Sequence, residues 1–461
     1  MTEFEKDMSS MGMKNESAEV KSSLGQEIYE TAQEIEPELV QIYEDLHAHP
    51  ELGGQETYTA ARVKEYLESL GIDILGENIG QPVTRTVEGE EETVNGTGIV
   101  ARIRGQEGGP TVALRADMDA LPFKDNDGKP FNAHACGHDT HTTGLLGAAK
   151  ILSNLASEGK LKGNAILLFQ PSEEKSSQKE SGAVQMVKFL EKEGLRSQIG
   201  AFFGLHVFRS MERGMIRLKE GVDLASSAEI DVKLKAPGGH VLNSYEVPNL
   251  KELSANIDSR LFAIFGPMKA KGEALVSSTF TKFDSTAYNS LSASADSTWV
   301  VRIPTEQYKE TSRDIQKEVQ AVVDEEVAKH LEQVGKGDIS VEVKPRAGYR
   351  PVIHRDPELV RIAKEAAEES MPNMQMSPDS DKILYGGEDF SFYLEELNHR
   401  QIPGAYVLLG GANREKGILP GNHHIPDFKV DPDVTVDMAA LYADFAQKAM
   451  KYLSESMKEE A

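Results

Sequence analysis

Short, uninterrupted apolar runs alternate with helical patterns over much of the chain. The apolar runs span residues 111–115, 164–169 and 200–207. Residues 142–155, by contrast, have the apolar spacing of a helix. Continuous apolar runs are typical of buried strands in a mostly parallel sheet that is flanked by helices. We therefore predict an α/β domain with a mostly parallel sheet, whose functional side chains follow the carboxyl ends of its strands.

The pattern changes near residue 226. Ile230, Val232 and Leu234 alternate with polar residues, as in a half-exposed strand, and residues 338–344 repeat this alternation. Two helical patterns and two further strand-like stretches lie between them, at residues 249–265, 307–334, 274–280 and 298–303. These elements predict a small α+β unit inserted into the α/β domain.

The α/β pattern resumes with Asp356 as a helix N-cap and Pro357 at the first helical position. We thus predict one domain that is split in sequence by a second one. The predicted segments are an acidic, disordered extension (1–37), the first part of the α/β domain (38–225), a lid or dimerisation domain (226–344) and the second part of the α/β domain (345–461).

Charge and hydropathy exclude several kinds of partner. The 461 residues include 75 acidic and 50 basic side chains, a net charge of −25, which repels the phosphates of nucleic acids. Residues 1–45 alone hold 12 acidic and 3 basic side chains, the basis for expecting an extension there. No apolar run approaches the ~18 residues of a membrane span, and the start lacks the pattern of a signal peptide. We expect a soluble, cytoplasmic protein with neither a nucleic acid nor a membrane as partner.

The densest cluster of reactive side chains is 134-HACGHDTH-141. It contains the only cysteine of the chain, Cys136, so an intramolecular disulfide is impossible. In an extended chain Cys136 and His138 point the same way, and a thiolate with an imidazole suits a borderline-soft divalent ion. Alone, this segment leaves open whether the cysteine is a ligand, a nucleophile or a buried apolar residue.

Further ligand candidates follow apolar runs or lie near the end of the chain. Glu173 and Glu174 come directly after residues 164–169, and two adjacent buried carboxylates need a cation or a proton. His206 ends another apolar run, and 423-HHIPDF-428 supplies two more imidazoles. Because strand ends converge in space, these groups together could form a two-metal hydrolytic site.

These motifs resemble those of the M20 metallopeptidase clan, most closely its aminoacylase-like branch of N-acyl-amino-acid, hippurate and indoleacetyl-amino-acid amidohydrolases. The resemblance covers about residues 38–445. The matching blocks are 46-LHAHPELGGQE-56, 114-LRADMDALP-122, 134-HACGHDTHTTGLLGAAK-150, 169-FQPSEE-174, 204-GLH-206, 238-GGH-240, 387-GEDFS-391 and 424-HIPDF-428.

The resemblance implies two divalent ions per subunit, of Zn, Mn, Co or Ni. The positions that match the family's ligands are Cys136, His138, Glu174, His206 and His424, with His423 as the alternative to the last. Glu173 matches the general base, which activates a water shared by the ions. Asp117 and Asp119 are expected to orient a ligand imidazole or to balance charge.

The resemblance also assigns residues of the lid. His240 matches a histidine that assists the tetrahedral intermediate, often in the partner subunit, so a homodimer through the lid is expected. Asn289 is expected to contact the substrate, and Arg302 is either a substrate ligand or a strand residue that faces water. His141, one helical turn after His138, is a further substrate-binding candidate.

Most departures from the family pattern lie in or near the lid, so the reaction is better supported than the substrate. The expected activity is metal-dependent hydrolysis of the amide bond of an N-acyl amino acid or a small related amide. Two alternatives stay open. One is a dipeptidase or aminopeptidase with the same site, and the other is a metal-binding homologue without turnover.

Overall fold

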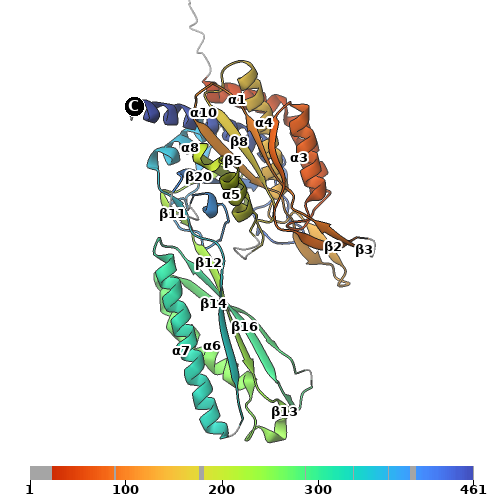
Figure 1. Cartoon of the computed structure of the whole chain (residues 1–461), viewed down its shortest axis with the longest axis vertical. Helices are drawn as coiled ribbons and strands as arrows, with labels where there is room; N and C mark the ends of the chain where they lie inside the picture. The colour runs from red at the N-terminus through yellow and green to blue at the C-terminus, as the bar shows by residue number, and fades with distance from the viewer. Residues whose placement is uncertain are drawn as a thin grey trace, which may run out of the picture.

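The computed structural model describes residues 23–87, 90–175, 181–285, 287–335, 337–371, 373–394 and 401–459. Its upper part is a broad α/β body, and its lower part is a long, narrow unit built on a second sheet (Figure 1). None of the helices in the described ranges combines the length and hydropathy of a membrane span.

The body is built on an eight-stranded sheet. The strands in spatial order are β1 (Asp73–Ile79), β4 (Gly98–Ile103), β8 (Asn164–Gln170), β5 (Thr111–Asp117), β9 (Ile199–Glu212), β20 (Gly404–Ala412), β10 (Met215–Arg217) and β19 (Gln375–Met376). The central strands β8, β5, β9 and β20 run parallel to one another. They are buried along nearly their whole length, so the prediction of a mostly parallel, helix-flanked sheet is confirmed.

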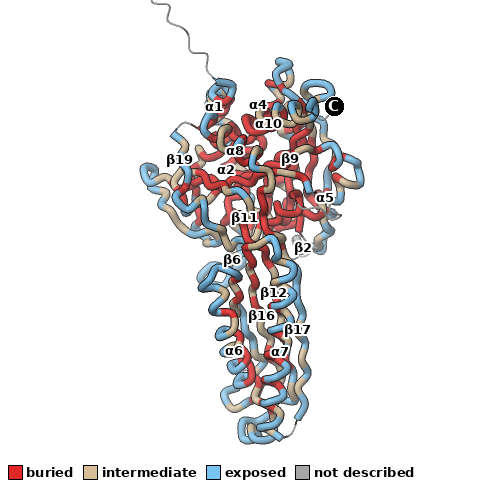
Figure 2. The backbone as a smooth tube through the Cα atoms, turned by 90° about the vertical axis from the view of Figure 1, so that its left-hand side faces the viewer, coloured by how far each residue is buried: buried red, intermediate tan, exposed pale blue. Residues whose placement is uncertain are grey.

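Helices cover both faces of this sheet. One core contains side chains of α1 (Leu24–Glu34), α2 (Glu36–His47), α3 (Thr57–Ser69), α4 (His138–Ser157), α8 (Pro357–Ser370) and α10 (Val434–Glu459). A second core contains side chains of α5 (Gly182–Lys192) and α9 (Ser391–Leu394). The buried tubes of Figure 2 concentrate in this layered body.

The first helix corrects one expectation. We predicted an extension up to residue 37, and residues 1–22 lie outside the described part of the chain. From Ser23 onward, however, the chain forms α1, and the side chains of Ile28 and Ala32 are buried in the core that α10 shares. The helix is amphipathic and polar overall, and its few apolar residues are placed on one face.

The narrow unit is an antiparallel sheet covered by two long helices. Its strands in spatial order are β14 (Leu275–Phe283), β16 (Ser294–Ile303), β12 (Ser226–Lys235) and β17 (Ser340–Ala347), and its helices are α6 (Leu250–Lys271) and α7 (Tyr308–Val334). Ile230, Val232 and Leu234 lie in its core beside Trp299, which is fully buried. The alternation in the sequence thus separates a helix-covered face from an exposed one.

Short ribbons complete the fold. β11 (Gly221–Leu224) pairs with β18 (Val352–His354) where the chain passes between the two sheets. The other pairs are β2 (Val83–Val87) with β3 (Glu90–Val94), β6 (Leu121–Lys124) with β7 (Pro130–Ala133), and β13 (Gly239–His240) with β15 (Ser290–Leu291). Two 3₁₀ turns span Arg196–Gln198 and Val241–Asn243. β13 lies at the end of the narrow unit that is farthest from the body (Figure 1).

Candidate metal centre

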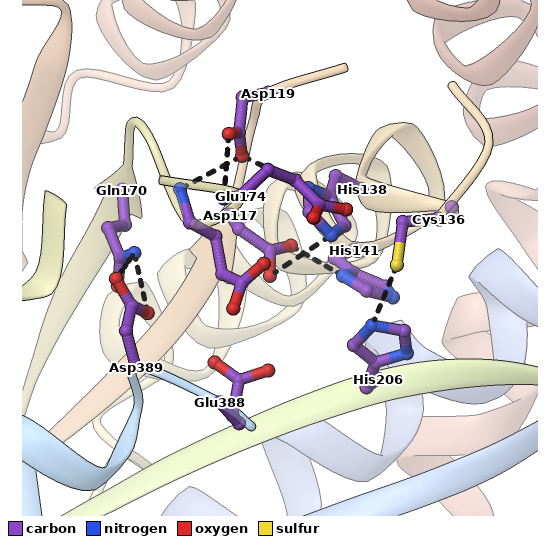
Figure 3. A network of polar contacts seen from close by, with 12 residues as sticks. Asp117, Asp119, Cys136, His138, His141, Gln170, Glu174, His206, Glu388 and Asp389 are labelled. Carbon is purple, nitrogen blue, oxygen red and sulfur yellow. Dashed lines mark hydrogen bonds and ion pairs between the residues drawn. The ribbon is translucent and has the colours of Figure 1, made fainter. Parts of the chain in front are cut away.

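The predicted ligands meet where β5, β8 and β9 approach the start of α4. Figure 3 shows Cys136, His138, Glu174 and His206 converging from segments that are far apart in sequence. The sulfur of Cys136 lies 3.4 Å from Nε2 of His206. Nε2 of His424 lies 3.2 Å from a carboxylate oxygen of Glu174. Strand ends and one helix start therefore gather a thiol, imidazoles and a carboxylate in one place.

A glycine makes this convergence possible. Gly137 is the N-cap of α4 and has a left-handed φ of 89°. A Cβ at this position would lie 2.3 Å from Cγ1 of Val207 on β9, so a larger residue would push the helix away from the strand. With glycine there, Cys136 ends the preceding loop and His138 begins the helix, both facing His206.

The donor atoms form overlapping groups of the size that metal ions require. Within each group the donor atoms lie within 4.8 Å of one another. Two of the groups are Cys136 with His138 and His206, and Cys136 with Glu174 and His424. The shared thiol joins them into one centre. Sulfur, nitrogen and oxygen donors in such a set fit zinc or a similar divalent ion.

One donor atom of this centre needs a further partner. Nε2 of His138 is buried and makes no hydrogen bond within the described residues, whereas Oε1 of Glu174, also buried, lies 3.2 Å from Nε2 of His424. Burial lowers the pKa of His138, but Asp117 and Cys136 outweigh this effect and hold it well above its usual value. Cys136 and Glu174 raise the pKa of His424 to about 10. An environment that draws protons onto imidazoles also attracts cations, so the residues present fit a metal centre.

Between His423 and His424, the geometry favours His424. Its backbone N–H donates to the carbonyl of Ala135 at 2.8 Å, which places its ring beside Cys136 and Glu174. It does so in a left-handed backbone conformation, with φ of 57°. Nε2 of His423 instead accepts the backbone N–H of Arg209 at 3.0 Å, and one ring nitrogen is thereby used.

Asp119 connects His138 to the turn that carries Glu173 and Glu174, called the glutamate turn below. Its carboxylate accepts the backbone N–H groups of Glu173 and Glu174 at 3.1 and 3.0 Å and Nδ1 of His138 at 3.1 Å. Because Nδ1 of His138 donates to Asp119, Nε2 can present its lone pair to the centre. Asp117 lies deeper, with a carboxylate oxygen 3.7 Å from Nε2 of the same ring. The orienting and charge-balancing roles expected for Asp117 and Asp119 stay predictions.

His141 does not fit the substrate-binding role that we predicted. Its side chain is fully buried, and both of its ring nitrogens have protein partners. Nε2 accepts the backbone N–H of Val207 at 2.8 Å, and Nδ1 donates to Asp117 at 2.5 Å. The helical spacing from His138 predicts a common face toward substrate, but the side chain of His141 packs on β9.

Glu173 has surroundings unlike those of Glu174. Its side chain is buried, and its carboxylate lies within 4.8 Å of the carboxylates of Glu388 and Asp389. Burial and then the negative charges of Glu388 and Glu174 raise its pKa well above the usual value. In Glu174 burial acts the same way, but the imidazoles of His424 and His138 outweigh it and lower the pKa. The two adjacent carboxylates are thus differentiated, as acid–base work requires.

A buried arginine neutralises this carboxylate cluster, and sequence reasoning missed it. Arg115 on β5 donates to Asp117 at 2.7 Å, to Glu388 at 3.0 Å and to Asp389 at 2.8 Å. Gln170 completes the network by accepting from Arg115 and donating to Asp389. Figure 3 shows the bond between Gln170 and Asp389. The signal was available, because a charged residue inside an otherwise apolar strand needs buried partners.

Glu56, in the first matched block, is hydrogen-bonded to the residue that precedes Glu173 in the glutamate turn. It is fully buried, and its carboxylate accepts the backbone N–H of Ser172 at 2.8 Å and the hydroxyl of Thr97 at 2.6 Å. Ser172 has a left-handed φ of 53°, so this bond stabilises a conformation that serine rarely adopts. The sequence placed Glu56 in a motif but gave it no role.

The centre opens into a cavity of about 520 Å³. Its walls combine the metal-facing residues with an apolar surface and one guanidinium, that of Arg302. The apolar and aromatic lining residues include Phe208, Leu224, Leu384, Tyr385, Tyr406 and Leu408. Arg302 reaches this cavity from β16, and the residue is partly exposed.

His240 and Asn289 are not brought to the cavity by their own chain. They lie next to each other, with Nε2 of His240 3.3 Å from the side-chain amide of Asn289. His240 is exposed and Asn289 is partly exposed, and both belong to the β13–β15 region at the far end of the narrow unit (Figure 1). Within one chain the two predicted residues therefore form a separate pair.

The comparisons with known proteins agree with this site. A model of "Peptidase family M20/M25/M40" matches residues 113–448. N-acetylcysteine deacetylase of Bacillus subtilis is 29% identical over 417 residues, which cover 88% of this chain and 96% of that protein. Thermostable carboxypeptidase 1 of Saccharolobus solfataricus is 28% identical over 421 residues, covering 90% and 96%. A dinuclear metal binding peptidase of the M20 family from Bacillus subtilis has a solved structure that matches with a TM-score of 0.66 and 26% identity, over 91% of this chain and 99% of that one. The chain therefore belongs to peptidase family M20/M25/M40, and it is a metal-dependent hydrolase of amide bonds.

Proposed function

We propose that this protein hydrolyses the amide bond of N-acyl amino acids or of small related amides. One observation carries the proposal. Five donor side chains meet around one centre; they come from the loop before α4, the first residue of α4, β9 and two further loops. The carboxylate of Glu173, whose pKa is raised, lies beside them. A related protein that is named N-acetylcysteine deacetylase supports this substrate class.

In this proposal two divalent ions, of Zn, Mn, Co or Ni, are held by Cys136, His138, Glu174, His206 and His424. Such ions supply Lewis-acid polarisation of a carbonyl and an acidified water near neutral pH. Asp119 fixes the ring of His138, and Asp117 with Arg115 balances the charge behind it. Cys136 is then a ligand and not a nucleophile.

Glu173 is the proposed general base and acid. It takes a proton from the water that attacks the scissile carbonyl and returns the proton to the amine nitrogen as the C–N bond breaks. Its raised proton affinity suits both steps, because a carboxylate with an ordinary pKa is a weak base near pH 7. The Asp119 carboxylate holds the backbone of Glu173, which limits the freedom of this side chain.

Arg302 is the proposed ligand of the substrate carboxylate. Burial lowers the pKa of Arg302, and the charge of Glu229 offsets this only in part. Its guanidinium donates to the carbonyl of Val301 at 3.3 Å, and it makes no ion pair within the described part of the chain. A partly desolvated cation in a cavity with apolar walls favours an anion that carries an apolar group, as an N-acyl amino acid does.

His240 and Asn289 would act on the cavity of a second copy of this chain. Large apolar side chains are exposed around them: Leu242 is 79% exposed, Tyr245 86% and Tyr288 100%. An exposed apolar group of this kind marks an interaction surface. In a homodimer through the narrow unit, His240 of the partner subunit would stabilise the oxyanion that forms during attack.

A peptidase reading rests on the similarity to a protein named thermostable carboxypeptidase. It differs from the main proposal in the group next to the scissile amide, which is a free amino terminus in a dipeptide and an acyl group in a blocked substrate. Initial rates should be compared on matched pairs such as N-acetyl-leucine and glycyl-leucine, with and without chelator. We expect chelator-sensitive turnover of the blocked member. Turnover of the unblocked dipeptides alone would show that the protein is a peptidase. Turnover of neither kind of substrate would show that it is a homologue without this activity.

A further inference from the structure

Two short segments carry the chain between the two sheets. On the way in, β11 ends at Leu224 and β12 begins at Ser226. On the way out, β17 ends at Ala347 and β18 begins at Val352, and Tyr349 lies in this second crossing. The side chain of Tyr349 is only 7% exposed and lines the metal-centre cavity together with Ser227.

The two crossings are tied to each other at Ser227. The backbone N–H of Ser227 donates to the carbonyl of Tyr349 at 2.9 Å, and the N–H of Tyr349 donates to Oγ of Ser227 at 2.9 Å. Gly348 permits this close approach, because a Cβ there would lie 2.6 Å from Oγ of Ser227. The position of Tyr349 is therefore set by the first residues of β12.

The phenol of Tyr349 then reaches the turn that carries the two glutamates. Its hydroxyl donates to the carbonyl of Lys175 at 2.7 Å and makes a short hydrogen bond to the carbonyl of Glu173. A single hydroxyl proton serves both acceptors, so the phenol is shared between the two ends of this turn. The ring itself packs edge-on against Phe392, with centroids 6.3 Å apart.

The turn is thus held from two sides. Asp119, which follows β5, holds the backbone N–H groups of Glu173 and Glu174. Tyr349 holds carbonyl groups of the same turn from the crossing between the sheets. A change in the orientation of the four-stranded sheet would move Ser227 and Tyr349 together. Through the hydrogen bonds of Tyr349 it would also displace the backbone of Glu173.

We propose that Tyr349 is a positioning residue that links the crossing between the two sheets to the turn bearing Glu173, so that the orientation of the narrow unit sets the position of this carboxylate. The proposal rests on the proposed function for its catalytic consequence. Its structural part, a mechanical link from Ser227 through Tyr349 to residues 173–175, can be measured without any substrate.

The structural arm measures hydrogen–deuterium exchange of the backbone amides of residues 173–175, in the full-length protein and its variants. Tyr349→Phe keeps the ring and removes the hydroxyl, and we expect exchange at Glu173 and Glu174 to rise about tenfold, the worth of one such hydrogen bond. Ser227→Ala should raise exchange in the same turn, and adding it to Tyr349→Phe should have no further effect there. Unchanged exchange in Tyr349→Phe, or effects of the two substitutions that simply add, would overturn the link.

The catalytic arm uses Tyr442→Phe as a matched control. Tyr442 is also buried, and its hydroxyl also donates to a backbone carbonyl, that of Arg115, at 2.6 Å. We expect Tyr349→Phe to lower kcat about 10- to 100-fold with KM and metal content near native values, and Tyr442→Phe to lower stability alone. Equal losses of kcat in both variants would reduce Tyr349 to a structural residue. If the native protein turns over no substrate of the panel, the proposed function fails, while the exchange arm still decides the link.

Discussion

The sulfur of Cys136 lies 3.4 Å from Nε2 of His206, although the two residues are 70 positions apart in the chain. Cys136 precedes a helix that crosses behind the sheet, and His206 lies within a central parallel strand. Burial raises the pKa of the Cys136 thiol, with Glu174 adding to the effect. A buried thiol with a raised pKa is a poor free nucleophile, whereas a bound cation would deprotonate it.

Substitution of this cysteine should therefore remove metal. We predict that Cys136→Ser binds less than one ion per chain after dialysis, measured by inductively coupled plasma mass spectrometry, because both donor groups share the thiol. Its activity should recover in part at high metal concentration. A variant with full metal content and no activity would indicate a nucleophilic cysteine instead.

Glu173→Gln should separate metal binding from catalysis. The amide keeps the size of the side chain but cannot accept the proton, so we expect native metal content and a kcat lowered by about 10²- to 10⁴-fold. Glu174→Gln is the matched variant at the neighbouring position, and it should lose metal as well as activity. Near-native kcat in Glu173→Gln would remove this residue from the mechanism.

Arg302→Met should weaken binding of substrates that carry a free carboxylate. Loss of a partly buried charge-assisted contact costs about 2–3 kcal/mol, which corresponds to a KM about 30- to 150-fold higher. A substrate whose carboxylate is replaced by a carboxamide should be affected little. Arg346→Met in the same sheet is the control, since Arg346 pairs with Glu229 and Asp231, each at 2.7 Å. Equal effects of Arg302→Met on acid and carboxamide substrates would contradict the assignment.

Asp444→Asn should stabilise the protein at alkaline pH. Asp444 is fully buried on α10, and burial with the charge of Glu369 raises its pKa to about 7, although Lys448 lies 3.7 Å away. Between about pH 4 and 7 the folded state keeps a proton that the unfolded state releases, so the native protein loses stability as the pH rises through this window. The asparagine is neutral throughout.

We expect the Tm of Asp444→Asn to exceed that of the native protein at pH 8 and the difference to vanish near pH 4. Asp431→Asn should behave in the opposite way. Burial raises the pKa of Asp431, but Lys416 and Asn413 outweigh it and lower the pKa. Its charged form therefore stabilises the fold above about pH 4, and the substitution should lower the Tm at pH 8. If the difference in Tm between Asp444→Asn and the native protein did not change with pH, ionisation of Asp444 would not destabilise the fold.

Much of the fold could be predicted because its signals are local. Uninterrupted apolar runs identified strands such as β8 and β9, and the alternation of Ile230, Val232 and Leu234 identified the second sheet. The candidate ligands could be named because motif spacing and strand ends are visible in sequence. The geometry of Cys136, His206 and Glu174 then followed from the parallel arrangement of the strands.

What could not be predicted depends on which side of an element is covered. The spacing of His141 on α4 is the same whether that face meets substrate or β9, and only the packed structure shows that it meets β9. The buried contacts of Ile28 require α10, which is about 400 residues later in the chain. His240 and Asn289 are neighbours in space, but their distance from the cavity depends on the length of the second sheet and on whether a partner is present.

The most direct test of the account is the number of metal ions per chain, measured together with turnover of N-acyl amino acids on the same purified protein. We predict two divalent ions per chain, loss of turnover in proportion to their removal by chelator, and recovery when Zn, Mn, Co or Ni is added back. Undiminished turnover by protein that retains less than a tenth of an ion per chain would contradict a metal-dependent site at Cys136, His138, Glu174, His206 and His424.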